Sequence, residues 1–451
     1  MRILYFDIDS LRPDHLGCYG YDRPTSPTID RLAEEGTRFT HYYCSDSPCM
    51  PSRHALITGR FGINNGVVTH GGPASKPFVD ERLYGGPKPH NQLLQRVIRE
   101  NGYDRVCFSN FAYRHCATWF GLGWSEFHSP SIGSGNVSAE EVNEAVLRWV
   151  NTFGDQDDYF LYINYWDPHR IYRVDESWAD RFSDYPVTQN WPNEEAIERH
   201  GAMDGSFTAF GQFPNHQSRV PLMPGAVTNR ADFEQMLTGY DATIAYTDFQ
   251  IQRVLDALEA QGVLEDTAII ISADHGDNFG EHGIYSDHVC ADEAIHNVPL
   301  IVRWPGVSKP GSVCDALLYN IDLSAGLCEL TGGQALSWYD GQSLAGFVRG
   351  EQPFNRDFLV WGHGLYTLQR AVRTKEHLMV RTYDDFGYEF DAVELYDMGR
   401  DRFQTRNLRE VEPDRVAKMD HLLNEWLYEQ SQKPYAIPDP MQIVLQLRQS
   451  L

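Results

Sequence analysis

The sequence predicts an α/β protein, a sheet flanked by helices, with a smaller α+β subdomain at its C-terminal end. Apolar runs at residues 3–9 and 267–273 are typical of buried strands, and helical periodicity lies between them. A chain of 451 residues is too long for one ordinary core. We therefore expect a large α/β domain over residues 1–350 and the subdomain over residues 351–451.

Two helices can be placed between the strands. Ser26 is predicted to cap a helix that has Pro27 at its first position and stops at Gly36. A longer helix is expected over about residues 231–261. Its apolar positions include Tyr240, Ile244, Phe249 and Leu255.

Both long apolar strands end at an acidic residue. Asp9 ends the first strand, and Asp274 follows the second. Ligands of open parallel α/β sheets bind beyond the carboxyl ends of the strands. The two carboxylates are therefore expected at one rim of the sheet.

The remaining segments are less regular. Residues 171–230 show little periodicity, as expected either of an insertion over a functional site or of a surface loop. Beyond Gly350, strand-like runs at 358–361, 371–373 and 378–380 precede a predicted helix near 413–429. These elements predict the α+β subdomain.

The net charge and the spacing of the cysteines indicate which partners and which cellular compartment to expect. A formal charge of −25 argues against nucleic acid and acidic membranes as partners. The sequence has no apolar run of membrane-spanning length, and its first residues lack the long apolar core and the small-residue cleavage site that are typical of a signal peptide. Its eight cysteines lack C-x-x-C pairs, which fits a reduced cytoplasm. If the chain is a trimmed mature form, it is periplasmic or secreted.

The segment from Cys49-Met50-Pro51-Ser52-Arg53 to Thr58-Gly59-Arg60 resembles the active-site signature of the type I sulfatases. The resemblance implies that a maturation enzyme oxidises Cys49 to formylglycine, whose hydrate attacks sulfur and then expels sulfate. Pro51 suits the first turn of a helix whose amides face a tetrahedral anion. The resemblance gives Arg53 the role of holding the deprotonated hydrate.

Two further segments resemble the metal motifs of the same family. They are Ile8 to Gly20 and Ser272 to Gly283. They imply that Asp9, Asp274 and His275 bind one divalent cation together with the modified Cys49. Ca²⁺ is the expected ion, with Mg²⁺ or Mn²⁺ as alternatives. Ser10 stands where many members have a second aspartate, and Asp7 on the same strand face is a ligand or a support for one.

Four further residues are candidates for contacts with the sulfate or the leaving group. Asp167-Pro168-His169 resembles a family segment, which makes His169 the first candidate for general acid. His288 falls where many sulfatases carry a lysine, and would donate a proton or only a hydrogen bond. Arg114 and His115 stand in for the lysine and histidine of the usual G-K-W-H-L-G, as anion clamp and formylglycine partner.

Together these motifs imply an alkaline-phosphatase-like mixed sheet and hydrolysis of sulfate esters of a small molecule or carbohydrate. One alternative is a phosphonate monoester or phosphodiester hydrolase of the same fold. The other is a non-catalytic paralogue that binds sulfated glycans. Ser52 after Pro51 favours the sulfatase over the first, and the intact segment from Cys49 to Arg60 argues against the second.

Overall fold

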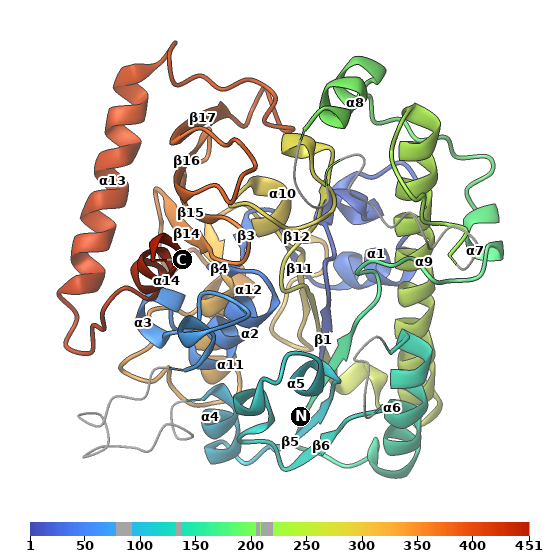
Figure 1. Ribbon diagram of the computed structural model, residues 1–451. Coiled ribbons are helices and arrows are strands. Elements are labelled where there is room, and N and C mark those ends of the chain that lie inside the picture. Colours follow the sequence, from blue (N-terminus) through green and yellow to red (C-terminus); the bar gives the residue numbers. More distant parts are fainter. Residues whose placement is uncertain (78–92, 132–136, 204–207, 209–219, 451) are drawn as a thin grey trace.

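A mixed eight-stranded sheet forms the centre of the protein (Figure 1). The structure is a computed structural model that describes residues 1–77, 93–131, 137–203, 208 and 220–450. The strands of the sheet, in spatial order, are β12 (Ser312–Cys314), β2 (Thr37–Phe39), β11 (Leu300–Arg303), β8 (Thr267–Ser272), β1 (Arg2–Ile8), β7 (Tyr159–Tyr165), β5 (Asp104–Phe108) and β6 (Glu126–His128). The expected α/β class with a mixed sheet is confirmed.

The register of the central strands brings two acidic loops together. Strand β1 is parallel to both β7 and β8, and Asp7 lies opposite Ser272 of β8. Asp9 and Asp274, each two residues further along, therefore leave the sheet at the same edge. This adjacency was predicted from the sequence.

Helices cover both faces of the sheet, as Figure 1 shows. One layer contains α1 (Pro27–Glu35), α6 (Ala139–Phe153), α9 (Arg230–Ala260) and the short α7 (Ser177–Asp180). The other contains α2 (Cys49–Thr58), α4 (Leu94–Glu100) and α11 (Asn320–Leu330). Shorter helices are α3 (Gly62–Asn65), α5 (Phe111–Arg114), α8 (Glu194–Gly201), α10 (Glu293–His296) and α12 (Ala345–Val348). Among the described residues, no helix is long and apolar enough to cross a membrane.

Helix α1 has the predicted limits, but its ends are held differently. The Ser26 hydroxyl accepts a hydrogen bond from Gly17 and does not cap the helix. Instead the Asp248 carboxylate of α9 accepts hydrogen bonds from the amides of Thr28 and Ile29 at 3.0 and 2.9 Å. Gly36 is extended, and a Cβ there would lie 2.5 Å from the carbonyl oxygen of Val302. Close packing against β11 therefore requires this glycine.

Helix α9 confirms the predicted long helix with one correction. Tyr240, Ile244 and Leu255 are buried, whereas Phe249 is 45% exposed. Its ring packs on the outer side of the helix against Trp178 of α7, at 5.6 Å between ring centroids. Phe249 therefore belongs to a surface aromatic contact, which helical periodicity alone did not separate from the core.

A second sheet contains the C-terminal strands and one short strand from far earlier in the chain. Its order is β17 (Val393–Asp397), β16 (His377–Asp384), β15 (Leu368–Arg373), β14 (Leu359–His363) and β4 (Asp46–Ser47). Helix α13 (Pro413–Ser431) packs on β15 and β16, and α14 (Pro440–Gln449) follows it. The described residues also form two small strand pairs. They are β9 (Asn278–Phe279) with β10 (Tyr285–Asp287), and β3 (Tyr42–Tyr43) with β13 (Leu318–Tyr319).

The irregular segment at 171–230 contains two short helices, α7 and α8, in its described part. Helix α8 packs beside residues 281–283, and Tyr172 bonds to the Ser286 hydroxyl at 2.8 Å. Residues 204–207 and 209–219 of this segment lie outside the described residues. The choice between an insertion over the site and a surface loop stays a prediction.

One buried carboxylate joins the loop after β1 to helix α9. Asp241 is fully buried and bonds to His15 Nδ1 at 2.8 Å, Tyr21 Oη at 2.7 Å and Arg23 Nη1 at 2.7 Å. Removing one partner of a buried ion pair leaves the other charge without compensation.

Asp241→Ala should therefore lower the free energy of unfolding by about 3–5 kcal/mol. Asp256→Ala, at an exposed position of the same helix, should change it by less than about 0.5 kcal/mol. Urea denaturation of the two variants measures both values. Equal stability of the two would contradict the anchoring role of Asp241.

Candidate active site

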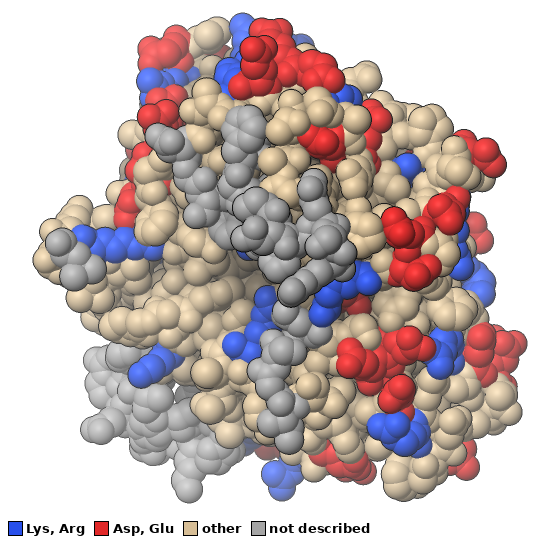
Figure 2. Space-filling model, turned by 45° about the vertical axis from the view of Figure 1, so that its right-hand side comes forward, with Lys and Arg blue, Asp and Glu red and all other residues tan. Residues whose placement is uncertain are grey.

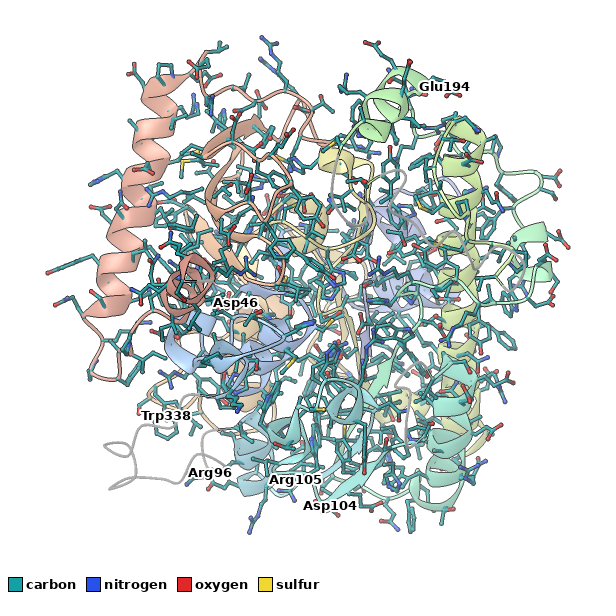
Figure 3. All side chains as sticks on the ribbon, in the orientation of Figure 1. Asp46, Arg96, Asp104, Arg105, Glu194 and Trp338 are labelled. Atoms are coloured by element: carbon teal, nitrogen blue, oxygen red, sulfur yellow. The ribbon has the colours of Figure 1, made fainter. Side chains whose placement is uncertain are left out.

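The second sheet and helix α2 together position Cys49. Strand β4 ends at Ser47, and α2 begins two residues later at Cys49 itself. Asp46, labelled in Figure 3, accepts a hydrogen bond from the Gly62 amide at 2.8 Å, which ties β4 to α3. The side chain of Cys49 is 1% exposed. A reactive group at this position is thus held by two parts of the fold.

The predicted helix start is present, although its amides are not all open toward a ligand. The amide of Met50 donates to His70 Nε2 at 3.3 Å. The Ser52 hydroxyl donates to the carbonyl oxygen of Asp274 at 2.7 Å, which ties the first turn of α2 to the loop after β8. His70 was not identified from the sequence, because it lies outside every recognised motif.

Arg53, one turn into α2, contacts three carboxylates at the sheet edge. Its Nε donates to Asp7 at 2.6 Å, and its Nη1 donates to Asp9 at 3.1 Å and to Asp274 at 2.6 Å. The Nη2 atom is buried and has no hydrogen-bond partner within the described part of the chain. Arg53 therefore balances the carboxylates and still has a donor to offer.

Four potential ligands converge beside Cys49. Ligand atoms of Asp9, Cys49, Asp274 and His275 all lie within 4.8 Å of one another, and all four residues are buried. His275 Nε2 is 3.1 Å from Cys49 Sγ and 3.3 Å from an Asp274 oxygen. His275 Nδ1 faces the carbonyl oxygen of Gly276 at 2.9 Å and so carries the proton, which leaves a lone pair on Nε2. Lone pairs of one nitrogen and two carboxylates thus face a common centre, an arrangement that fits a cation.

Asp7 and Ser10 lie next to this cluster. Asp7 accepts hydrogen bonds from Arg53 Nε, Tyr162 Oη and Asn164 Nδ2, so its carboxylate is occupied by neutral and cationic donors. The Ser10 hydroxyl donates to Asp9 at 3.3 Å, and its amide donates to Asp274 at 3.2 Å. Asp7 thus contacts Arg53, and Ser10 contacts the potential ligands Asp9 and Asp274.

The burial of this cluster shifts its protonation equilibria. Burial, followed by the charge of Asp274, raises the pKa of Asp9 to about 6. Burial likewise raises the pKa of Asp274 to about 6, although Arg53 opposes the rise. Burial and the charges of Asp9 and Asp274 raise the pKa of the Cys49 thiol. The unmodified thiol is consequently protonated at neutral pH and is a poor nucleophile.

His288 lies beside the cluster, with ligand atoms of Cys49, His275 and His288 within 4.8 Å of one another. Its ring lies 4.2 Å from the ring of His275, and its Nδ1 donates to Asp277 at 2.7 Å. Arg170 forms an ion pair with Asp287, the residue before His288. Burial lowers the pKa of His288, but the carboxylates of Asp287 and Asp277 outweigh burial and the net shift is upward. Asp277 lies in the recognised segment from Ser272 to Gly283. Arg170 directly follows His169, but the sequence did not identify it as a site residue.

The pKa of His169 is shifted in the opposite direction to that of His288. Its ring stacks on Trp166 at 3.7 Å and lies 5.6 Å from His288. Nδ1 faces the carbonyl oxygen of Arg170 at 2.7 Å, so the neutral ring carries its proton there and not on Nε2. Burial, followed by the charge of Arg114, lowers the pKa of His169.

Arg114 and His115 end the short helix α5 near the same residues. The Arg114 guanidinium lies over the Trp166 ring. His115 packs 4.8 Å from His70, and its Nε2 is buried with no hydrogen-bond partner among the described residues. The structure thus brings every sequence-predicted site residue into one region, together with Trp166, His70, Asp277 and Arg170.

The surface charge is uneven around the molecule. On the face shown in Figure 2, Asp and Glu side chains gather at the top and the right with some Lys and Arg among them, and further Lys and Arg side chains lie near the middle and at the left. The formal charge of −25 therefore describes the whole surface, not the field at one place on it.

Comparisons with known families match most of the chain. The family model described as sulfatase matches residues 2–333. A second model, described as N-sulphoglucosamine sulphohydrolase, C-terminal, matches residues 280–433.

Individual relatives are distant but extend over nearly the full length. An N-acetylglucosamine-6-O-sulfatase of Bacteroides thetaiotaomicron is 22% identical over 97% of this chain and 87% of its own. A Δ4,5-hexuronate-2-O-sulfatase of the same organism is 26% identical, over 90% of this chain and 84% of its own.

Solved structures resemble the whole fold. One, described as bound to its substrate D-glucosamine-2-N,6-O-disulfate, has a TM-score of 0.75 at 19% identity and covers 98% of this chain and 99% of its own. A phosphonate monoester hydrolase of Agrobacterium radiobacter has a TM-score of 0.70 at 20% identity, with coverage of 96% and 95%. With the family model covering 332 residues of the chain, the protein belongs to the sulfatase family and is a sulfate ester hydrolase of alkaline-phosphatase-like fold.

Proposed function

We propose that this sulfatase acts on a sulfated carbohydrate, using formylglycine made from Cys49 and one divalent cation held by Asp9, Asp274 and His275. The observation that carries the proposal is the convergence of these four side chains within 4.8 Å of one another. The unpartnered Arg53 Nη2 beside the carboxylates supports it, because it offers a buried donor for an anionic oxygen.

The donor set fits a hard or borderline cation. Two carboxylates and one imidazole nitrogen suit Ca²⁺, Mg²⁺ or Mn²⁺, and Ca²⁺ is our first choice because oxygen donors predominate. Formylglycine supplies a hydrated aldehyde as nucleophile, and the bound cation neutralises charge on the sulfate oxygens. Asp7, Ser10 and Ser52 orient the residues that hold it.

Arg53 has two tasks in this proposal. Its Nε and Nη1 keep three carboxylates in place, and its free Nη2 donates to the attacking oxygen. Arg114 adds positive charge for binding the sulfate, since it interacts electrostatically with both Asp9 and Cys49. Two guanidinium groups thereby bring an anionic substrate to a strongly acidic protein.

The proton for the leaving oxygen is assigned to His288 in preference to His169. His288 Nδ1 is held by Asp277, which leaves Nε2 as the second N–H of a cationic ring. His169 keeps its proton on Nδ1 against a carbonyl oxygen, so its Nε2 is an acceptor. His169 instead contributes to substrate binding through the ring stacked on Trp166.

A carbohydrate is proposed because the named relatives act on sulfated sugars. One similar structure is described with D-glucosamine-2-N,6-O-disulfate as its substrate, and two relatives are named as sugar sulfatases. Because a phosphonate monoester hydrolase has a similar fold, phosphonate ester hydrolysis is measured alongside sulfate ester hydrolysis. A panel of sulfated monosaccharides, an aryl sulfate and a phosphonate monoester tests both. A higher kcat/KM for the phosphonate ester would overturn the sugar-sulfate assignment.

Cys49 should be converted to formylglycine when the protein is expressed with a maturation enzyme, and activity should follow the converted fraction. The tryptic peptide 39–53 also contains Cys44, which is buried and should keep its sulfur, so it serves as an internal control. Peptide mass spectrometry locates the loss of sulfur. Full activity in a sample with unmodified Cys49 would refute the proposal, because the thiol is protonated at neutral pH.

Affinity for the divalent cation should fall as the pH drops below 6. Asp9 and Asp274 have pKa values of about 6, so they are ionised at pH 7.5 and largely protonated at pH 5, and a bound cation needs them ionised. We expect Kd for Ca²⁺ to rise at least about tenfold between pH 7.5 and pH 5. Calorimetric titration at both values checks this. An unchanged Kd would place the metal on other ligands.

His288→Ala should lose far more kcat on a sugar sulfate than on nitrophenyl sulfate, because only the sugar alcohol needs a proton to leave. His169→Ala should affect the two substrates alike, because its contact is common to both. Steady-state kinetics on the two substrates give the ratio for each variant. If the differential loss appears in His169→Ala instead, the proton donor is His169.

A further inference from the structure

We propose that His282, Cys290 and Asp292 form a second metal site, one that selects a zinc-like ion. The three residues lie on the segment between β9 and α10, with His282 before β10 and Cys290 and Asp292 after it. His288 lies between His282 and Cys290 in sequence. The site is separate from the cluster at Cys49 and shares no ligand with it. It does not depend on how Cys49 reacts.

The geometry is close to that of a bound ion. The ligand atoms of the three residues lie within 4.8 Å of one another, and His282 Nε2 is 3.8 Å from an Asp292 oxygen. In a tetrahedral zinc site with ligands at about 2.0–2.3 Å, neighbouring ligand atoms are about 3.3–3.8 Å apart. Small side-chain movements would therefore bring three ligands to a zinc ion, and a water would take the fourth position.

The protonation state of His282 already suits a ligand. Gln404 Oε1 accepts a hydrogen bond from the Glu293 amide at 3.0 Å, which fixes the orientation of the side-chain amide. Its nitrogen then donates to His282 Nε2 at 2.6 Å. Nε2 consequently carries a lone pair, and a metal would take the place of the Gln404 donor.

Negative charge exceeds positive charge around these residues. Glu281 pairs with Arg12 at 3.0 Å, but Arg12 also binds Asp14 at 2.8 Å. Glu281, Asp292 and Glu394 are all buried. A cation would stabilise the ionised carboxylates and a Cys290 thiolate together.

The donor types distinguish this site from the one at Cys49. A thiolate, an imidazole and one carboxylate favour Zn²⁺, whereas carboxylates favour Ca²⁺ or Mg²⁺. Asn278, which contacts both Cys290 and Asp292, would support the ligands from behind. Because His282 and Cys290 flank His288, a metal here would hold the loop that carries the proposed proton donor.

Cobalt(II) absorption tests the site, because a cobalt–thiolate bond gives a charge-transfer band. The full-length chain is used as Cys49→Ala, which removes the other clustered thiol. With excess Ca²⁺ present to fill the site at Asp9, Asp274 and His275, this protein should show the band and bind one Zn²⁺ by elemental analysis, and Cys49→Ala/Cys290→Ser should lose both. Cys44 is the matched control, because it is also buried and lies 3.4 Å from His296 Nδ1. Cys49→Ala/Cys44→Ser should keep the band.

Two results would overturn the proposal. One is the absence of the band in Cys49→Ala at saturating cobalt, and the other is its persistence in Cys49→Ala/Cys290→Ser. Circular dichroism establishes that each variant is folded. If Cys290→Ser does not fold, His282→Asn in the Cys49→Ala background replaces it, with loss of zinc expected and unchanged zinc content refuting the site.

Discussion

The guanidinium of Arg53 is the contact on which the rest of the site depends. It joins helix α2 to carboxylates at the ends of two strands, β1 and β8, that lie more than 250 residues apart in sequence. Without a cation, Asp7, Asp9 and Asp274 would repel one another in a medium that screens charge poorly. The same group that allows three acids to be buried together also keeps a buried Nη2 donor that has no partner among the described residues, and the proposed mechanism uses that donor. Stability and chemistry are therefore combined in one side chain.

The sequence was informative wherever a pattern was local or a strand end was fixed by burial. Apolar runs predicted β1 and β8, and the parallel-sheet rule then placed Asp9 and Asp274 at one edge, where they are found. The segment around Cys49 identified the helix start and Arg53. From the sequence, Arg53 was expected to contact only the reacting group at position 49. Its contacts with three acids depend on how α2 docks against the sheet, which no local pattern contains.

Other features could be identified only from the folded structure. Strand β4 has only two residues, too few for any periodicity, and its partner β14 lies some 300 residues later. The cap of α1 comes from Asp248 on another helix, so the preference of Ser26 for caps was misleading. Proton positions on His169 and His288 follow from whether a carbonyl or a carboxylate faces Nδ1. The sequence motifs make His169 the first candidate for general acid, whereas these proton positions are the reason why we propose His288.

The pairing of β4 with β14 also determines how late in synthesis the segment before Cys49 can fold. Residues 46–47 pair with residues 362–363, so the segment before Cys49 cannot take its final place until more than 300 further residues have been made. Synthesis at about 5–20 residues per second makes that interval roughly 15–60 s. Until then Cys49, which is 1% exposed in the folded protein, lacks the strand pairing that precedes it. Faster translation, or faster docking of the second sheet, would shorten the period open to the proposed oxidation of Cys49.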